Sequence, residues 1–451
     1  MNLSVRTLRF SQATLVGGAI ASTLLVPVEP SWASAPAATA TPTFENSPKA
    51  VLDEAWQIIN SEYVDGDFNQ VDWQAVRQTL LGRQYTSREE AYSVLRSTLR
   101  RLNDPYTRFL DPREYAELTE QTSGETSGVG VRLRRDVQTG RVFVTEVVEG
   151  SPAQQAGLQA GDQLLLVDSQ STERLTIEGI AQRLRGEEGS RVTVTLSRNG
   201  SQPRTVVLTR TLMEIPTVEY AFKQQGSSRI GYIRLLEFNA HAAEQMERAI
   251  NQLTQQGVEG FVLDLRGNPG GLYGASIEIS RMWLQRGDIV KTIDRDGHSE
   301  SIRADGTAIT QLPLTVLVDG RSASSSEILT GALRDNNRAT VVGSTTFGKA
   351  LVQSLHGLSD GSGLTVTVAH YYTPNGTDIS RKGIVPDIQV QLSDRQRLEL
   401  FSDPMQLATA ADMQYVQAAA ALEQTILSQR SDPGTSPTPQ LGLIEPEPIA
   451  P

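Results

Sequence analysis

Two residue types that together can make and break acyl bonds stand close to each other in "GRSASSSEILTGALRDNNRATVVGSTTFGKALVQ", residues 320–353. Four serines precede a run whose apolar residues have helical spacing, and Lys349 follows in a glycine turn. A serine hydroxyl becomes a nucleophile when a nearby base removes its proton. A lysine with its ordinary pKa of about 10.4 is protonated at neutral pH, but burial among apolar groups lowers that value by several units. The pattern therefore allows Ser/Lys catalysis of acyl transfer.

Structural roles explain the same residues equally well. Ser324, with Glu327 three positions later, fits a capping box at the start of a helix. A lysine is more often a surface residue than a base. At a helix N-terminus, however, the amide of Ser325 would point toward a developing oxyanion, which favours a nucleophile just before it. Spacing alone leaves both interpretations open.

A second glycine turn stands in "GFVLDLRGNPGGLYGASIEISRMWL", residues 260–284. "GFVLDL" is typical of a buried strand, and "ASIEISRMWL" can start a helix. Gly270 and Gly271 have no side chain to block a ligand, so their backbone N–H groups can meet negative charge on a carbonyl oxygen. A plain strand-to-helix turn is the alternative. A phosphate loop is not, because the Gly-Lys-Ser/Thr sequence of a P-loop is absent from this segment.

Composition excludes several other chemistries. The 451-residue chain has a net charge of -11 and no dense basic stripe, which argues against a nucleic-acid partner. It contains no cysteine, which rules out disulfides, thiolate zinc sites and a cysteine nucleophile. Its four histidines are scattered without an HExxH motif, at positions 241, 298, 356 and 370. We therefore expect neither a metal nor a cofactor.

The two ends of the chain have the composition of segments outside a folded core. Residues 1–35 combine arginines, an apolar run and small residues before Ala33 and Ala35, which is the pattern of an export signal. Residues 36–48 form an Ala/Thr/Pro linker, and the Pro-rich residues 430–451 are expected to be disordered. The mature protein should be soluble, without a membrane span, and outside the cytoplasm.

Between these ends the pattern changes three times. Residues 49–120 have helical spacing of apolar residues, with Ser87 and Glu90 as a capping box and two proline breaks in "NDPYTRFLDPREY". Residues 121–211 contain short β-branched strands and turns. Residues 212–395 alternate strands and helices, and residues 396–429 are helical again, most clearly from 404. The chain is long enough for several domains, each with its own core.

The β-rich region has a further signature in "GVGVRLRRDVQTGRVFVTEVVEGSPAQQAGLQAGDQLLLVD". The run Gly128-Val129-Gly130-Val131 precedes a strand, so its N–H groups can point outward together and bind a carboxylate. "SPAQQAG" predicts a short helix, and "QLLLV" a buried strand. From Gly128 to Leu196 the sequence resembles a PDZ domain, which implies a module that holds a polypeptide C-terminus.

The motifs "DLRGNPGG", "GRSASSSEILTGALRDNNRATVVGSTTFGKALVQ", "YYTPNG" and "KGIVPDI" together resemble the C-terminal processing proteases, which are Ser/Lys endopeptidases with an inserted PDZ domain. The resemblance covers residues 49–395. It implies an α+β multidomain fold: an N-terminal helical region, the PDZ-like β domain, an α/β catalytic core of the ClpP/crotonase-like type, and a C-terminal helical segment.

The resemblance also assigns roles to residues. The nucleophile falls on Ser324, the general base on Lys349, and the residue that orients the lysine on Gln353. The oxyanion donors would be the backbone amides of Gly270 or Gly271 and of Ser325. Asp335 matches an acidic position implicated in some members, and we expect it to support structure. Where the family usually has alanine and glycine, this chain has Ser325 and Ala350, and the second change could strain a turn that needs positive φ.

The expected function is cleavage of proteins near a free, apolar C-terminus, without cofactor. The helical segment before the PDZ resembles the cyanobacterial and plastid branch, which trims a photosystem II reaction-centre precursor in the thylakoid lumen. We expect the lumen or the periplasm as the location. Broad quality-control degradation and a catalytically silent PDZ adaptor stay open as alternatives, as does the oligomeric state.

Overall fold

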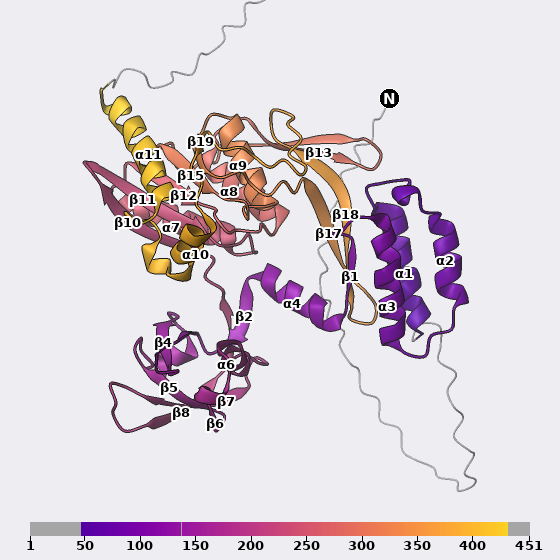
Figure 1. Cartoon of the computed structure of the whole chain (residues 1–451), viewed down its shortest axis with the longest axis horizontal. Helices are drawn as coiled ribbons and strands as arrows, with labels where there is room; N and C mark the ends of the chain where they lie inside the picture. The colour runs from indigo at the N-terminus through magenta and orange to yellow at the C-terminus, as the bar shows by residue number, and fades with distance from the viewer. Residues whose placement is uncertain (1–46, 137, 432–451) are drawn as a thin grey trace, which may run out of the picture. The chain divides into compact units, whose positions relative to one another are not determined.

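A computed structural model describes residues 47–136 and 138–431 of the chain. The predicted export signal, most of the linker and nearly all of the Pro-rich tail therefore lie outside the described residues. The described chain contains four hydrophobic cores, one for the N-terminal helices, one for the predicted PDZ region and one on each face of a central sheet. The expected α+β multidomain fold is confirmed (Figure 1).

The N-terminal region is helical, as its spacing predicts. Its elements are α1 (Pro48–Glu62), η2 (Phe68–Gln70), α2 (Trp73–Gly82), α3 (Arg88–Leu99) and η3 (Arg100–Leu102). The Ser87 side chain caps α3 by accepting the N–H of Glu90 at 3.1 Å. The predicted reciprocal bond is different, because the Glu90 carboxylate accepts the N–H of Thr86. The predicted capping box is thus half formed.

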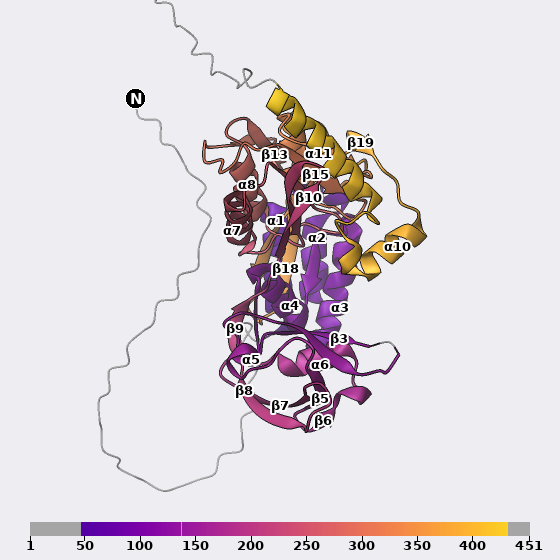
Figure 2. The ribbon, with the colours of Figure 1, turned by 90° about the vertical axis from the view of Figure 1, so that its left-hand side faces the viewer.

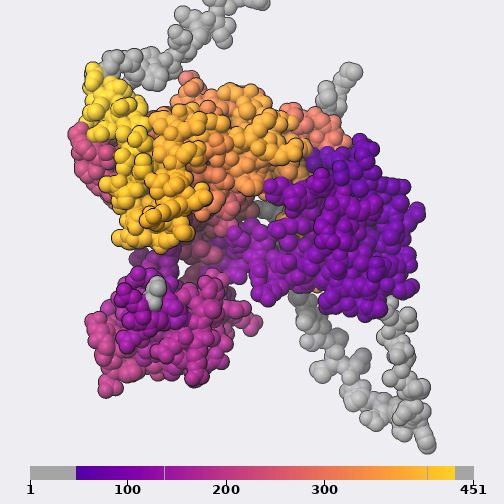
Figure 3. Space-filling view, in the orientation of Figure 1, coloured from indigo at the N-terminus to yellow at the C-terminus, as the bar shows by residue number. Residues whose placement is uncertain are grey.

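The segment with the two proline breaks ties this region to the rest of the protein. It contains β1 (Arg108–Leu110) and α4 (Pro112–Ser123), whose capping box is formed by Asp111 and Glu114. Strand β1 pairs antiparallel with β18 (Gly363–Tyr372), far along the chain. The space-filling view shows the indigo N-terminal residues against the orange residues of that later segment (Figure 3).

Strand β18 is the centre of the smaller of the two sheets outside the predicted PDZ region. Its strand order is β1-β18-β13-β14, with β17 also paired to β18. The remaining bounds are β13 (Asp288–Asp294), β14 (Ser299–Arg303) and β17 (Leu351–Gly357). Leu364 and Val366 of β18 pack into the core of the N-terminal helices. The N-terminal region and the sheet that carries β17 thus share one core.

The predicted PDZ region is a six-stranded sheet with two short helices. Its strands are β3 (Val131–Arg135), β4 (Val142–Val147), β5 (Gln163–Val167), β6 (Gln170–Ser171), β7 (Arg191–Ser197) and β8 (Arg204–Thr209). The helices are α5 (Pro152–Gln155) and α6 (Ile177–Leu184), with η4 (Thr172–Arg174) between strands. The chain enters through β2 (Glu125–Gly128) and leaves through β9 (Thr211–Glu214), which pair with each other.

The central sheet holds the two segments whose residues suggested chemistry. Its order is β10 (Val218–Gln225), β11 (Ser228–Leu235), β12 (Gly260–Asp264), β15 (Leu314–Val318), β16 (Thr340–Gly343) and β19 (Ile388–Gln389). Apart from the β10–β11 hairpin, neighbouring strands are parallel. The turns after β12 and β15 therefore lie at the same edge of the sheet, which is where open α/β sheets bind ligands.

Side-chain alternation along these strands explains the two layers of helices. Val316 and Val318 pack into the core with α7 (Ala242–Gln255), α8 (Tyr273–Trp283) and α9 (Ser325–Asp335), while Leu317 packs against α11 (Met413–Ser431). Figure 2, in which the ribbon of Figure 1 is turned by 90°, shows α7 and α8 on one side of the strands and α11 on the other. Both faces of the central strands β12 and β15 are covered, and every residue of these two strands is buried.

The C-terminal region, predicted as a helical segment, consists of more than one helix. It contains α10 (Asp394–Ser402), η5 (Pro404–Gln406) and then α11, which starts only at Met413. Pro404 cannot continue a helix, and the Asp412 carboxylate accepts the N–H of Tyr415 to begin a new one. Within the described residues, none of the helices is long and apolar enough to cross a membrane.

Candidate active site

Ser324 occupies a strained turn between β15 and α9. Its backbone has φ 54° and ψ −115°, which a residue other than glycine adopts only at a cost of about 1–3 kcal/mol. Such a conformation persists only when surrounding contacts impose it. The residue is half-buried at the N-terminus of α9, where the first N–H groups of the helix have no partner within it.

The carboxylate of Glu327 is one of the contacts that impose this turn. It is fully buried and accepts the N–H of Ser324 at 3.0 Å, so the predicted capping pair exists. The same carboxylate also accepts three groups from the turn that carries the lysine: the Thr346 hydroxyl at 2.6 Å, Gly348 N–H at 2.7 Å and Lys349 N–H at 2.9 Å. Burial raises the pKa of Glu327, although these four donors oppose the shift.

Tyr371 of β18 makes a second bridge between the same two residues. Its hydroxyl lies 3.2 Å from the carbonyl oxygen of Ser324 and also contacts the carbonyl oxygen of Lys349. The ring is buried, with 2% of its surface exposed. Ser324 and Lys349 are therefore joined through their N–H groups by Glu327 and through their carbonyl groups by Tyr371.

Lys349 has the environment that a lysine base needs. Burial, and secondly the positive charge of Arg108, lower the pKa of its amine, while Asp104 and Glu327 act in the opposite direction. Its Nζ lies 4.5 Å from the centroid of the Tyr106 ring. Among the described residues, the Lys349 side chain makes no hydrogen bond to Ser324 or Gln353. The backbone of Lys349 is thus joined to the turn of Ser324 through Glu327, while its amine lies over the face of the Tyr106 ring.

The two other predicted side chains lie in different surroundings. Gln353 is on β17, next to the point where the pairing of β17 with β18 shifts register, and its buried Nε2 has no hydrogen-bond partner among the described residues. Asp335 ends α9, about 16 Å along the helix from Ser324 at 1.5 Å per residue. Its carboxylate accepts the N–H of Asn375 at 3.0 Å, which is a structural contact.

The glycine turn after β12 approaches Ser324 closely. A Cβ on Gly270, which has φ +105°, would lie 2.9 Å from the Cβ of Ser324 and 2.8 Å from the carbonyl oxygen of Ala323. The Gly270 N–H already donates to Oδ1 of Asn268 at 2.9 Å. In contrast, the N–H groups of Gly271 and Ser325 donate to no other described residue, and the Ser325 hydroxyl donates to the Gly271 carbonyl at 3.0 Å.

A buried ion network holds the residues that precede this turn. Arg266, which precedes it, pairs with Asp264 at 2.6 Å and with Asp412 at 2.7 Å, and all three side chains are fully buried. The hydroxyl of Tyr232 also donates to Asp264. Removing one partner would leave a buried charge unpaired, so the network fixes the end of β12 against the start of α11.

The departure at Ala350 causes no backbone strain. Gly348 has φ +88°, and a Cβ there would lie 2.8 Å from the backbone N of Gly383. Ala350 is not among the described residues with positive φ, and its methyl group packs in the core with 2% of its surface exposed. The turn therefore needs glycine before the lysine but accepts alanine after it.

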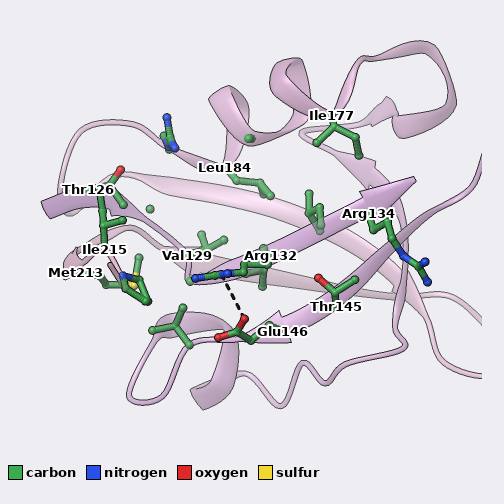
Figure 4. Close-up of a pocket in the computed structure, with 18 of the residues that line it drawn as sticks. Thr126, Val129, Arg132, Arg134, Thr145, Glu146, Ile177, Leu184, Met213 and Ile215 are labelled. Atoms are coloured by element: carbon green, nitrogen blue, oxygen red, sulfur yellow. Dashed lines mark ion pairs between the residues drawn. The ribbon is translucent and has the colours of Figure 1, made fainter. Parts of the chain in front are cut away.

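The predicted peptide-binding residues line a cavity of about 1070 Å³, which is bordered by the PDZ region and also by Leu236, Asp403 and Met405 of later segments. Its apolar lining includes Val129 beside β3, and Ile177 and Leu184 of α6, which the close-up shows on one groove (Figure 4). Arg132 and Glu146 form an ion pair of 3.2 Å at its border. The N–H groups of Val129 and Gly130 donate to no other described residue, and β3 is an edge strand.

Three residues of this site have no catalytic role in the sequence interpretation. Glu327 is expected only as a helix cap, Tyr371 stands in the motif "YYTPNG" without an assigned role, and Tyr106 stands in a segment interpreted as a proline break. The position of Glu327, three residues after Ser324, indicates a helix cap and not a bond to the lysine turn. Nothing in the sequence connects the Tyr371 hydroxyl or the Tyr106 ring with Ser324 or Lys349.

Comparisons with known proteins identify the family of the chain. The model of peptidase family S41 matches residues 229–390, that of the PDZ domain residues 143–198, and that of the Tricorn protease C1 domain residues 44–81. The chain is 42% identical over 381 residues to the carboxyl-terminal-processing protease of Synechocystis sp., covering 84% of this chain and 87% of that protein. It is 40% identical over 356 residues to the chloroplastic C-terminal processing peptidase of Tetradesmus obliquus, covering 75% and 76%.

A solved structure shows the same architecture. The photosystem II D1 C-terminal processing protease is 38% identical to this chain, with a TM-score of 0.50, over 76% of this chain and 93% of that one. The match includes the order of elements expected from the sequence, with a PDZ domain and an S41 protease core.

Proposed function

The chain belongs to peptidase family S41 as a carboxyl-terminal-processing serine protease, and on this premise we propose that Ser324 is its nucleophile and Lys349 its general base. One observation carries the proposal: the Glu327 carboxylate binds the backbone N–H of Ser324 and that of Lys349. The two residues thus have a common anchor, and burial lowers the pKa of the Lys349 amine, which favours the neutral form that a general base needs.

The reaction is acyl transfer in two steps. Neutral Lys349 takes the proton of the Ser324 hydroxyl as its oxygen attacks the scissile carbonyl, and the lysine then gives that proton to the leaving amine. An ester joins the N-terminal part of the substrate to Ser324. Water then attacks this ester while Lys349 takes its proton, and the lysine returns that proton to the Ser324 oxygen as the ester bond breaks and the new C-terminus is released. Each step uses side chains and amides of the chain itself.

The amides of Gly271 and Ser325 are the proposed oxyanion donors. Both N–H groups are without a described partner, whereas the N–H of Gly270 is occupied by Asn268. Gly270 then contributes by allowing the turn to approach Ser324. These preorganised N–H dipoles would stabilise the negatively charged oxygen of the tetrahedral intermediate more strongly than the uncharged carbonyl oxygen of the substrate.

Gln353 is the proposed partner of the neutral lysine. Its Nε2 is buried and has no described hydrogen-bond partner, which costs about 1–3 kcal/mol unless a partner arrives. When Lys349 turns toward Ser324, its neutral amine can donate an N–H to Oε1 of Gln353, which leaves the lone pair of the amine free for the Ser324 proton. Asp335, with its contact to Asn375, is proposed to be structural.

The PDZ groove is proposed to select free, apolar C-termini. A peptide can add as a strand to the free edge of β3, and its carboxylate can accept the N–H groups of Val129 and Gly130. The apolar side chains of Val129, Ile177 and Leu184 suit an apolar last residue. Recognition of the end would hold the chain while an upstream bond reaches Ser324.

The physiological substrate is proposed to be a photosystem II reaction-centre precursor, cleaved in the thylakoid lumen or the periplasm. The support is the likeness to a D1 C-terminal processing protease and to chloroplastic peptidases. The predicted export signal in residues 1–35 agrees with this location.

A cleavage assay with matched reporters tests the function. The chain from residue 36 is incubated with an unfolded reporter that has an apolar C-terminus, either free or amidated, and products are identified by mass spectrometry. Wild type should cleave the free reporter and cleave the amidated one more slowly. Ser324→Ala and Lys349→Ala should cleave neither. Equal cleavage of both reporters would refute C-terminus recognition, and activity in Ser324→Ala would refute the assigned nucleophile.

A further inference from the structure

The ammonium group of Lys349 has an aromatic neighbour from a distant part of the chain. Nζ lies 4.5 Å from the centroid of the Tyr106 ring, within the range of an attractive cation–π contact. Tyr106 belongs to the segment between η3 and β1, whereas Lys349 precedes β17. The N-terminal helical region therefore contributes a side chain to the catalytic centre, which the motifs around Ser324 and Lys349 do not indicate.

Several hydrogen bonds hold this segment against β18. The Tyr106 carbonyl accepts the Thr365 hydroxyl at 2.7 Å, and Oδ2 of Asp104 accepts the hydroxyls of Thr107 and Thr367, each at 2.7 Å. The Thr107 hydroxyl in turn accepts the N–H of Thr367 at 3.0 Å. None of these bonds uses the phenol or ring of Tyr106. The position of the ring is thus fixed by its backbone and neighbours, and the side chain can be replaced without breaking them.

The ring acts on the lysine in one direction only. Its negative face attracts the protonated ammonium but not the neutral amine. Burial and Arg108 favour the neutral amine, while Asp104 and Glu327 favour the ammonium, as does the Tyr106 face. The ring therefore counteracts the effect of burial on the pKa of Lys349. It also holds the ammonium group away from a hydrogen bond with Ser324.

We propose that Tyr106 is a positioning residue of the active site, whose ring face holds the protonated Lys349 until loss of the proton frees the amine to reach Ser324. This inference rests on the proposed role of Lys349 as general base. It gives the N-terminal helical region a function beyond packing: that region sets the pH at which the protease becomes active.

The test compares the pH dependence of kcat/KM for wild type, Tyr106→Phe, Tyr106→Leu and a variant with pentafluorophenylalanine at position 106. The fluorinated ring keeps the shape of phenylalanine but loses the negative face. Rates are measured on the free-C-terminus reporter from about pH 5 to about pH 10, where the rise reports the pKa of the free enzyme's base. Circular dichroism and thermal unfolding check that each variant is folded.

Tyr106→Phe should keep the midpoint of the acid limb, because the ring face is retained. In Tyr106→Leu and the fluorinated variant the midpoint should move to lower pH by about half a unit to one and a half units. A common midpoint in all four proteins, or a shift to higher pH from admitted water, would overturn the inference. Lys349→Ala is the control: activity in that variant would defeat the proposed function itself, whereas an inactive Lys349→Ala with unshifted midpoints would defeat only the role of Tyr106.

Discussion

Ser324 and Lys349 donate their backbone N–H groups to the same atom, Oε2 of Glu327, at 3.0 and 2.9 Å. The helix that begins after the nucleophile and the turn that carries the base are therefore fixed relative to each other by one buried carboxylate. Its other oxygen accepts Thr346 and Gly348 from the lysine turn. The capping pair at this helix thus also spaces the two reacting groups.

Glu327→Gln tests whether the Glu327 carboxylate sets the distance between Ser324 and Lys349 or only fills space in the core. The side chain keeps its shape, but one carboxylate oxygen becomes an NH₂ group that faces backbone donors. We expect kcat to fall by about 100-fold, because a displacement of about 1 Å in a catalytic group has that effect. The free energy of unfolding should fall by about 1–3 kcal/mol. Steady-state kinetics and urea denaturation measure both, and wild-type kcat in a folded variant would contradict the spacing role.

Tyr371→Phe removes only the hydroxyl that contacts the carbonyl oxygens of Ser324 and Lys349. The ring, which fills the core, remains. We expect kcat to fall by about tenfold, which corresponds to the loss of one net hydrogen bond of about 1 kcal/mol or slightly more. KM should stay near that of wild type, since the hydroxyl does not line the PDZ groove. A change in KM with unchanged kcat would argue against the bridge.

Gly270→Ala tests the close approach of the glycine turn. The added Cβ would lie 2.9 Å from that of Ser324, at φ +105°, so the turn must move or strain by about 1–3 kcal/mol. We expect loss of cleavage and a lower thermal unfolding temperature. Gly274→Ala is the matched control, because a Cβ there meets nothing within 4 Å and the position is helical. It should retain cleavage and gain about 0.5–1 kcal/mol of stability.

The free energy of unfolding of Lys349→Met tests whether burial of the Lys349 ammonium group destabilises the folded protein. Because the folded-state pKa of Lys349 is lowered from 10.5, the unfolded chain binds more protons between the folded value and 10.5. Wild-type stability should therefore rise with pH through that interval, and the penalty should be complete below it. Lys349→Met has no such penalty, so it should be more stable than wild type at neutral pH, with a difference that shrinks as pH approaches 10.5. A pH-independent difference in urea denaturation would contradict this.

Short-range patterns made the main elements predictable. The apolar runs before Ser324 and after "GVEG" are β15 and β12, and "SEILTGALRD" is α9, because burial on both faces of a parallel sheet leaves a continuous apolar signature. The motif resemblance supplied Ser324 and Lys349 as candidates. The sequence predicts only one helical segment for the C-terminal region, whereas α10 ends at Ser402 and α11 begins at Met413.

Contacts between distant segments were not predictable from either source. The bonds from Glu327 to Gly348 and Lys349, from Tyr371 to Ser324, and the placement of Tyr106 on Lys349 all depend on how β18 pairs with β1 and β17. The register of β1 on β18, which lie far apart in the chain, is fixed by packing and not by local spacing, and the β17–β18 hairpin contains a register shift at Val352 and Gln353. The occupied N–H of Gly270 is different, because its partner is the side chain of Asn268, two residues earlier in the same turn.

The central claim is that the substrate becomes covalently attached to Ser324 with the help of Lys349. The most direct measurement is an acid-quenched single turnover on the free-C-terminus reporter, followed by mass spectrometry of the peptide that contains Ser324. The account predicts an ester between the N-terminal reporter fragment and the Ser324 hydroxyl in wild type, and no such adduct in Lys349→Ala. Rapid cleavage with the adduct on another residue, or an undiminished adduct in Lys349→Ala, would contradict it.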